Sequence, residues 1–465
     1  MKQNESQEWS RHYQGKLLLR HEIHLDDSIF QQLLDASYVT PMPAIQRKYF
    51  QHECQRCGNR KRSLFGRIPC QICHKTHMYC RKCIDMGRVM ACTPLYQWTG
   101  PDVTWPCHLD ACTWTGTLTM AQKQGADRIG RAIQHHDKEL LVWAVCGAGK
   151  TEMMISGLTE AFRQGQRVCL ATPRTDVVQE LLPRLQQAFS GIDIQALYGG
   201  SSNKEGTAQF IIATTHQLMR FRHAFDTVVI DEVDAFPYTN DPSLPFAVRR
   251  AVKPSGTTIY LTATPRQKHQ MLIAAKKLPH VFVPVRFHGH PLPVPMLRKS
   301  RSLKKDLDRF RPPDRFLEWY NRRKHPERQI LVFVPSIHLA ETLADHMASV
   351  LDDCSVRAVH ASHNDREHII QQFRNRSFHM LITTTILERG VTFPAVDVAV
   401  LAADHHVFDE AALIQIAGRA GRSPHDPTGD VVFFHSGKTE AMVTAIRSIK
   451  QMNQRGGLSN ELSMV

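Results

Sequence analysis

The chain has 465 residues, enough for about three domains, and its 42% hydrophobic and 22% charged residues are typical of folded globular sequences. Its 58 lysines and arginines outnumber its 44 acidic residues, and the resulting formal charge of +14 favours polyanions as partners. The apolar runs fall well short of the roughly 18 residues that span a bilayer, and the N-terminus is polar. We therefore expect neither an integral membrane protein nor a secreted one.

Composition shifts along the chain predict five segments. They are an N-terminal segment (1–53), a cysteine-rich zinc-binding module (54–115), a first α/β domain (116–285), a basic, proline-rich connector (286–328) and a second α/β domain (329–465). In both long segments apolar strands alternate with amphipathic helices, which predicts parallel sheets with crossover helices. The expected fold class is therefore α/β, with two tandem parallel-sheet domains preceded by a small zinc-binding module.

The cysteine-rich module holds nine of the twelve cysteines, between Cys54 and Cys112. Disulfide scaffolds occur mainly in small secreted domains, so Cys-x-x-Cys pairs in a long chain without an export signal indicate metal binding. Three such pairs are present: Cys54/Cys57, Cys70/Cys73 and Cys80/Cys83. A structural zinc ion takes four thiolates, so these six candidates exceed one site.

The surplus ligands leave alternatives open. Cys70 and Cys73, with His74 and His77, are an alternative ligand set, spare thiols or part of a second ion site. The other cysteines of the module lack compact spacing, and we interpret them as structural: Cys92, Cys107 and Cys112. Three tryptophans fit packing better than base stacking: Trp98, Trp105 and Trp114.

Positive charge is concentrated in two places. Residues 54–90 carry a net +8, and residues 286–329 carry a further +8. Dense basic patches attract the phosphate backbone of nucleic acids. We therefore predict that both regions contact nucleic acid.

Buried strands and one helix are predicted from the apolar pattern of the two α/β segments. In the first segment a helix is expected at 150–163 and strands at 140–145, 167–172, 210–214, 227–231 and 257–262. In the second segment strands are expected at 330–334, 380–383, 396–401 and 430–434.

The first of these strands runs into the motif AVCGAGKT at 144–151, a P-loop in which Ala144 replaces the usual first glycine. Backbone N–H groups of such a loop surround phosphate oxygens, and the following helix directs its positive end toward the same anion. Lys150 is expected to bridge the β- and γ-phosphates, and Thr151 to ligate Mg²⁺. The nucleotide-binding residues are predicted to be Ala144, Val145, Cys146, Gly147, Ala148, Gly149, Lys150 and Thr151.

The strand at 227–230 ends in the acidic box DEVD at 231–234. Ligands of open α/β sheets bind at the carboxyl ends of the strands. Asp231 is expected to hold Mg²⁺ through water, and Glu232 to align the attacking water as general base. With the P-loop, this box predicts ATP hydrolysis.

The motif QIAGRAGR at 415–422 lies in the second α/β segment. Its arginines, Arg419 and Arg422, are three residues apart, so one helical turn can point both the same way. A guanidinium that reaches the γ-phosphate would act as an arginine finger. We expect both to be catalytic.

The ordered set of motifs over residues 116–450 resembles superfamily-two helicases and translocases, which implies two RecA-like domains. LTMAQ at 118–122 resembles the motif whose glutamine, here Gln122, contacts adenine. Three segments resemble the helicase motifs that contact the nucleic-acid strand: ATPR at 171–174, TTHQ at 214–217 and LVFVPS at 331–336. TAT at 262–264 and TTTILERGVT at 383–392 resemble elements that couple hydrolysis to movement.

A closer resemblance is to the ComFA family of competence ATPases from Gram-positive bacteria, and it covers nearly the whole chain. It rests on CQRCG at 54–58, YCRKC at 79–83, DEVDAFP at 231–237, TTILERGVTFP at 384–394 and PTGDVVFFH at 427–435. The family motif implies that Zn²⁺ is held by Cys54, Cys57, Cys80 and Cys83.

This resemblance implies a function: an ATP-driven motor on single-stranded DNA that acts in uptake of transforming DNA, with ATP, Mg²⁺ and Zn²⁺ as cofactors. The implied location is the cytoplasmic face of the cell membrane. The implied partners are the membrane DNA-uptake channel and other competence proteins, and a homo-oligomer is a separate possibility that the resemblance does not supply. The alternatives are a replication-restart DNA helicase, a DNA-binding adaptor switched by nucleotide, and an RNA helicase.

Overall fold

The computed structural model describes residues 3–201, 205–351, 354–363 and 365–457. These residues form two compact units. One comprises Met1–Val142 and Thr151–Val281, and the other comprises Trp143–Lys150 and Phe282–Val465. Among the described residues, no helix has both the length and the apolar composition needed to cross a bilayer.

A small antiparallel sheet, in the order β1-β8-β2, organises the N-terminal region. Its elements are α1 (Gln3–Tyr13), β1 (Leu17–Leu18), α2 (Asp27–Asp35), β2 (Val39–Met42) and β8 (Leu95–Trp98). Its core contains Leu18, Phe30, Leu33 and Trp98, so the packing interpretation of Trp98 is confirmed. β8 is the middle strand of this sheet and pairs with both β1 and β2. The segment between β2 and β8 is therefore an insertion in the N-terminal fold.

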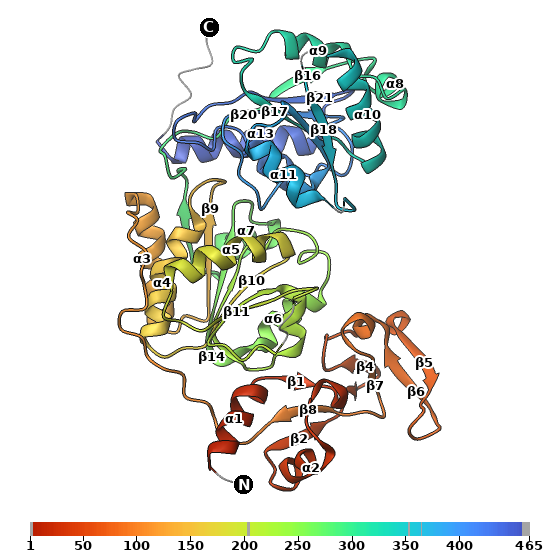
Figure 1. Ribbon diagram of the computed structural model, residues 1–465, viewed down its shortest axis with the longest axis vertical. Helices are drawn as coiled ribbons and strands as arrows, with labels where there is room; N and C mark the ends of the chain where they lie inside the picture. Colours follow the sequence, from red (N-terminus) through yellow and green to blue (C-terminus); the bar gives the residue numbers. More distant parts are fainter. Residues whose placement is uncertain (1–2, 202–204, 352–353, 364, 458–465) are drawn as a thin grey trace. The chain divides into compact units, whose positions relative to one another are not determined.

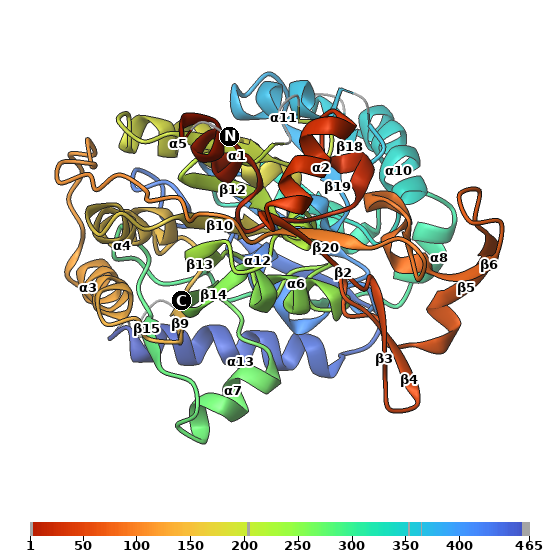
Figure 2. The same cartoon turned by 90° about the horizontal axis from the view of Figure 1, so that it is seen from below.

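In the inserted segment, short antiparallel strands flank the paired cysteines, which lie at strand ends, in loops and in a 3-10 helix. One hairpin consists of β3 (Ile45–Lys48) and β4 (Gln51–Cys54), and Figure 2 shows it as a projecting arm. The second sheet, β5-β6-β7, consists of β5 (Phe65–Pro69), β6 (Thr76–Cys80) and β7 (Val89–Met90). The 3-10 helix η3 (Arg81–Met86) joins β6 to β7.

The first parallel sheet has seven strands in the order β11-β12-β10-β13-β14-β9-β15. They are β9 (Glu139–Ala144), β10 (Val168–Thr172), β11 (Ile194–Leu197), β12 (Phe210–Thr214), β13 (Phe225–Ile230), β14 (Val252–Thr262) and β15 (His280–Val283). The helices are α3 (Met120–Gln134), α4 (Lys150–Arg163), α5 (Thr175–Ala188), η4 (Thr215–Arg220), α6 (Ser243–Ala251) and α7 (Gln267–Ala274). Helices α4 and α5 lie beside the strands in Figure 1. The strands that the sequence predicts here are confirmed, because their valine and isoleucine runs are buried.

The second parallel sheet has six strands in the order β16-β21-β20-β17-β19-β18, and all five neighbouring pairs are parallel. They are β16 (Met296–Lys299), β17 (Gln329–Phe333), β18 (Val356–Val359), β19 (Met380–Thr383), β20 (Val396–Leu401) and β21 (Val431–His435). Helices α10 (Ile337–Val350), α11 (Arg366–Arg374), α12 (Glu410–Ala417) and α13 (Glu440–Arg455) complete the fold, and Figure 1 shows α10, α11 and α13 around the sheet. The predicted fold class, two parallel-sheet α/β domains, is confirmed.

The stretch 286–328, predicted as a connector, also builds the second fold. It supplies edge strand β16 and two helices, α8 (Leu303–Asp308) and α9 (Asp314–Asn321). Their apolar side chains enter the core under the sheet: Leu303, Leu307, Phe316 and Trp319. The proline and arginine content hides this apolar spacing in the sequence.

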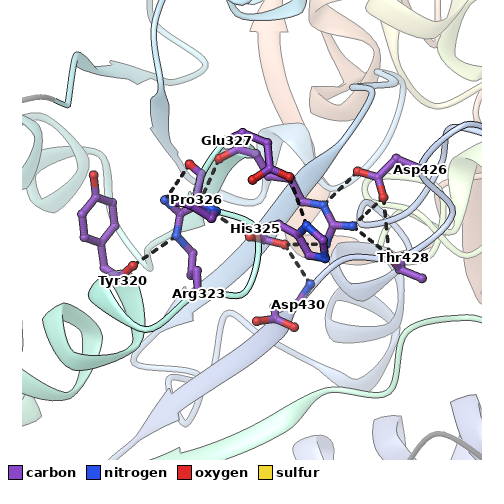
Figure 3. Close-up of polar contacts among 10 residues, drawn as sticks. Tyr320, Arg323, His325, Pro326, Glu327, Asp426, Thr428 and Asp430 are labelled. Atoms are coloured by element: carbon purple, nitrogen blue, oxygen red, sulfur yellow. Dashed lines mark hydrogen bonds and ion pairs between the residues drawn. The ribbon is translucent and has the colours of Figure 1, made fainter.

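Part of the positive charge in this stretch is used inside the fold, as Figure 3 shows. The Arg328 side chain is only 7% exposed and forms ion pairs of 2.5 Å with Asp426 and 3.5 Å with Asp397. Arg323 pairs with Asp397 at 3.5 Å. Burial raises the pKa of Asp397. The charge counted from sequence therefore overstates what this region can present to phosphates.

Candidate nucleotide-binding and zinc-binding sites

The phosphate loop joins the end of β9 at Ala144 to the start of α4 at Lys150. Gly147 and Gly149 have φ angles of +80° and +77°, a backbone region in which a Cβ is strained. The N–H of Ala148 donates to the carbonyl of Val145 at 3.1 Å. The loop therefore curls ahead of a 14-residue helix, as an anion-binding cradle requires.

Within the second unit, this loop lies directly against the segment 415–422. The Cys146 thiol donates to Gln415 Oε1 at 3.1 Å. A Cβ on Gly418 would lie 2.5 Å from Cys146 Cβ, so only glycine fits at this approach. The structure thus brings together the P-loop and the arginine-bearing motif, which the sequence separates by more than 250 residues.

The two arginines of that motif are oriented by neighbouring groups. Arg419 is 1% exposed, and its Nε donates to the carbonyl of Glu388 at 2.9 Å. Arg422 donates from Nε to the Gly418 carbonyl at 2.9 Å and from Nη1 to Thr392 Oγ1 at 3.3 Å. Glu388 and Thr392 both belong to the segment 383–392. The motif at 415–422 is therefore hydrogen-bonded directly to that segment. Contact of either arginine with a γ-phosphate stays a prediction.

Arg286 is a candidate functional residue that the sequence analysis missed. It is 1% exposed, and its Nη2 donates to the carbonyl of Ala420 at 2.9 Å. A Cβ placed on Gly147 would lie 3.2 Å from Arg286 Nε, and the N–H of Phe287 donates to the Gly147 carbonyl at 2.9 Å. Burial, with the charge of Arg422, lowers the pKa of Arg286 to about 10, so the guanidinium stays charged at neutral pH. A permanent positive charge therefore lies beside the phosphate loop.

The acidic box follows β13 and is held by β14. Asp231 is buried, and its Oδ1 accepts from the N–H of Glu232 at 2.9 Å. Glu232 has a φ of +56°, an uncommon backbone state for a residue with a side chain, and such states concentrate at functional sites. Asp234 accepts from the hydroxyls of Thr262 at 2.6 Å and Thr264 at 2.5 Å. The acidic box is thereby tied to TAT at 262–264, in line with the coupling role that the helicase resemblance implies.

Gln122 lies at the start of α3, where it forms a reciprocal cap with Thr119. The Thr119 N–H donates to Gln122 Oε1 at 2.9 Å, and the Gln122 N–H donates to Thr119 Oγ1 at 3.3 Å. The spacing T-x-x-Q just before an amphipathic helix is the signature of this cap. Adenine contact by Gln122 stays a prediction.

The four cysteines of the family motif converge in one buried cluster. The sulfurs of Cys54, Cys57, Cys80 and Cys83 all lie within 4.8 Å of one another. Cys54 and Cys83 are 3.7 Å apart, and Cys57 and Cys80 are 3.6 Å apart. A tetrahedral site with Zn–S bonds of ~2.3 Å has sulfur–sulfur edges of ~3.8 Å. The residues therefore fit Zn²⁺, which would stabilise this small module when bound.

The zinc-binding cluster packs against the first parallel-sheet domain. The Arg250 side chain, on α6, donates from Nη1 to the carbonyls of Gln55 at 2.6 Å and Arg56 at 2.5 Å, within the Cys54–Cys57 loop. It also donates to the carbonyls of Met219 at 2.5 Å and Phe221 at 3.0 Å, at the end of η4. One guanidinium thus joins the cysteine loop to η4, the element that contains most of the TTHQ motif.

Comparison with protein families places three models in order along the chain. Residues 3–97 match the Competence protein ComFA N-terminal domain. Residues 115–267 match the type III restriction enzyme res subunit, and residues 312–424 match the helicase conserved C-terminal domain. The order fits the geometry of a zinc-binding module followed by two motor domains.

Solved structures show the same fold. Dbp5 of S. cerevisiae bound to RNA and ADP BeF3 has a TM-score of 0.52 and 19% identity, over 72% of this chain and 91% of that one. Helicase Lhr of Mycobacterium smegmatis bound to ssDNA and AMP-PNP has a TM-score of 0.50 and 18% identity, over 73% of this chain and 50% of that one. Fold and site together define a helicase-like motor protein with two RecA-like domains, a class that implies the use of ATP and Mg²⁺.

Curated relatives identify the family. The chain is 42% identical to Competence protein ComFA of Bacillus subtilis (strain 168) over 97% of this chain and 96% of the relative. It is 39% identical to Competence protein ComFA of Streptococcus pneumoniae over 84% and 92% of the two chains. The chain belongs to the ComFA family and is a competence-related, helicase-like motor.

Proposed function

We propose that this protein is a DNA-dependent ATPase that moves along single-stranded DNA and helps bring transforming DNA across the cytoplasmic membrane. The contact between the phosphate loop and the arginine motif, from Cys146 to Gln415 at 3.1 Å, carries the proposal. A motor needs hydrolysis to be coupled to a change at its nucleic-acid contacts. This contact supplies the first link, since the arginine motif is itself bonded to the segment 383–392.

The residues divide the chemistry among them. Phosphoryl transfer depends on positioning and on neutralising charge more than on covalent steps by the protein. Lys150 and the loop N–H groups hold the phosphates, and Thr151 with Asp231 would hold Mg²⁺, which neutralises phosphate charge when bound. Glu232 orients the attacking water, while Arg419 and Arg422 stabilise the charge that develops on the γ-phosphate. Arg286 adds a fixed positive charge beside the loop.

The segment inserted between β2 and β8 offers groups that suit single-stranded DNA. Its exposed basic side chains can contact phosphates: Lys61, Arg62, Arg67, Lys75, Arg81 and Arg88. The turn of the β3–β4 hairpin exposes two aromatic residues, Tyr49 (94%) and Phe50 (93%). Aromatic rings stack on unpaired bases of any sequence. The combination supports binding to single strands without sequence preference.

Location and partners follow from the family. We propose that the protein works at the cytoplasmic face of the membrane, where it meets the DNA-uptake channel and other competence proteins. Membership in the ComFA family supports this proposal.

The test is ATP hydrolysis by the purified full chain, alone, with single-stranded DNA and with RNA. We expect stimulation by DNA, and loss of hydrolysis in Lys150→Ala with DNA binding retained, because DNA contacts lie outside the phosphate loop. Lys138→Ala, an exposed lysine before β9, is the matched control and should hydrolyse ATP normally. Unchanged turnover in Lys150→Ala would overturn the motor proposal.

The other outcomes separate the alternatives. ATP binding without turnover would indicate a nucleotide-switched adaptor, and preferential stimulation by RNA would indicate an RNA helicase. Uptake of labelled DNA by a transformable bacterium that lacks its own ComFA tests the cellular role. Normal uptake with the Lys150→Ala chain as the sole copy would exclude an ATP-driven role in uptake and favour replication restart.

A further inference from the structure

A second group of cysteines meets in the β5-β6-β7 sheet, apart from the four cysteines of the family motif. The sulfurs of Cys70, Cys73 and Cys92 all lie within 4.8 Å of one another. Cys70 and Cys73 are in the loop between β5 and β6, whereas Cys92 follows β7. The pairing of β6 with β7 brings Cys92 to the loop: Tyr79 pairs with Met90, and the N–H of Ala91 donates to the carbonyl of Met78 at 2.8 Å.

The loop of Cys70 and Cys73 has the same backbone hydrogen bonds as the loop of Cys54 and Cys57. In the first loop the N–H of Gly58 donates to the Cys54 carbonyl at 2.8 Å, and the N–H of Cys54 donates to the Asn59 carbonyl at 3.0 Å. In the second loop the N–H of His74 donates to the Cys70 carbonyl at 2.9 Å, and the N–H of Cys70 donates to the Lys75 carbonyl at 2.9 Å.

The residue after the second cysteine has a left-handed backbone in both loops, with φ of +69° at Gly58 and +56° at His74. Histidine adopts this conformation less readily than glycine. The second loop therefore adopts the same backbone conformation as the Cys54–Cys57 loop, although the histidine at position 74 does not favour it.

A fourth ligand adjoins the group, but its ring nitrogens do not lie within 4.8 Å of all three sulfurs, so an ion would have to draw it inward. His77, on β6, places Nε2 3.1 Å from the Cys73 sulfur. In a tetrahedral zinc site with bonds of ~2.3 Å to sulfur and ~2.0 Å to nitrogen, these two atoms are ~3.5 Å apart. All three cysteines are free of disulfide bonds. Thiolates and imidazole are the ligands that select Zn²⁺ among common cellular ions.

We propose that Cys70, Cys73, Cys92 and His77 form a second zinc site of the Cys₃His type. The ion fixes the β5–β6 loop to the chain segment after β7, so the loop, which bears the exposed side chains of Ile72 and Lys75, becomes rigid. The family motif does not include this site.

Zinc content of the full chain, purified under reducing conditions and measured by elemental analysis, tests the proposal. We expect two ions per chain in the wild type and one in Cys92→Ser. Cys107→Ser removes an exposed cysteine outside both clusters and should keep two ions. One ion per wild-type chain, or two in Cys92→Ser, would overturn the proposal.

Two further measurements keep the test decisive if Cys92→Ser folds poorly. His77→Ala preserves the three thiolates and should release one of its two ions to a chelator at a lower chelator concentration than the wild type. Trypsin should cleave after Lys75 faster in His77→Ala when the chelator is present, because the loop then loses its ion. Identical zinc release from His77→Ala and wild type would exclude His77 as the fourth ligand.

Discussion

The Cys54–Cys57 loop and the Cys70–Cys73 loop share a backbone geometry but have different surroundings. In the first, a Cβ on Gly58 would lie 2.5 Å from the ring of Phe246, and Arg250 donates to the carbonyls of residues 55 and 56. In the second, residues 71–76 are all exposed. Local sequence therefore sets the shape of each loop, whereas packing decides whether a disturbance in the loop reaches the motor domain.

The largest effect should come from Arg250→Ala, which removes the guanidinium between the first loop and η4. Several buried carbonyls lose a charged donor, and each buried group left unsatisfied costs roughly 1–3 kcal/mol. We expect the free energy of unfolding of this region to fall by about 3 kcal/mol or more. In a thermal scan, zinc release should then precede the unfolding of the first parallel-sheet domain, instead of coinciding with it.

Arg249→Ala is the matched control, since Arg249 is the exposed neighbour on the same helix. In this variant, zinc release and the unfolding of the first parallel-sheet domain should still occur at the same temperature. If Arg250→Ala behaves like Arg249→Ala, the two loops do not differ in their link to the motor, and the comparison fails.

A smaller effect is expected from Gly58→Ala. The left-handed backbone costs an alanine ~1–2 kcal/mol, and the contact with Phe246 adds a steric penalty. We expect a loss of about 2–3 kcal/mol in the stability of the module, measured by urea titration of zinc release. The double variant Gly58→Ala/Phe246→Ala should recover the steric part relative to Phe246→Ala alone. Additive effects of the two substitutions would show that Phe246 does not press on this loop.

The smallest effect should come from His74→Gly, the matching position in the second loop. Relief of the left-handed strain stabilises the loop, while the added freedom of glycine in the unfolded chain opposes it, so we expect a net change within about 1 kcal/mol. The same zinc-release titration measures it. A loss as large as that in Gly58→Ala would show that the second loop is as tightly packed as the first.

Much of the fold and of the site could be predicted from the sequence because the signals are local. Strands such as β12, β19 and β20 are short runs of buried apolar residues, and the P-loop and acidic box are contiguous motifs that follow strands. The family motif also selected the four cysteines that converge. The positions of these motifs along the chain therefore follow from short stretches of sequence alone.

The missed features depend on contacts between distant segments. Cys92 joins the second cysteine group only because β7 pairs with β6, and no spacing rule in the sequence signals that register. Arg286 was counted with a basic connector, because its burial against the phosphate loop requires knowing where residue 420 lies. Likewise, the edge strand β16 is too short and too charged to be recognised as a strand from the sequence.

The cap formed by Thr119 and Gln122 has a consequence for the choice of nucleotide. Because the Gln122 carbonyl oxygen accepts from the Thr119 N–H, the side-chain amide cannot rotate without breaking the start of α3. A purine that meets this amide has to match a fixed order of donor and acceptor. Adenine presents an acceptor at N7 beside a donor at N6, whereas guanine presents two acceptors. If the base binds here, as the helicase resemblance implies, discrimination between ATP and GTP is enforced by the same hydrogen bond that starts a helix.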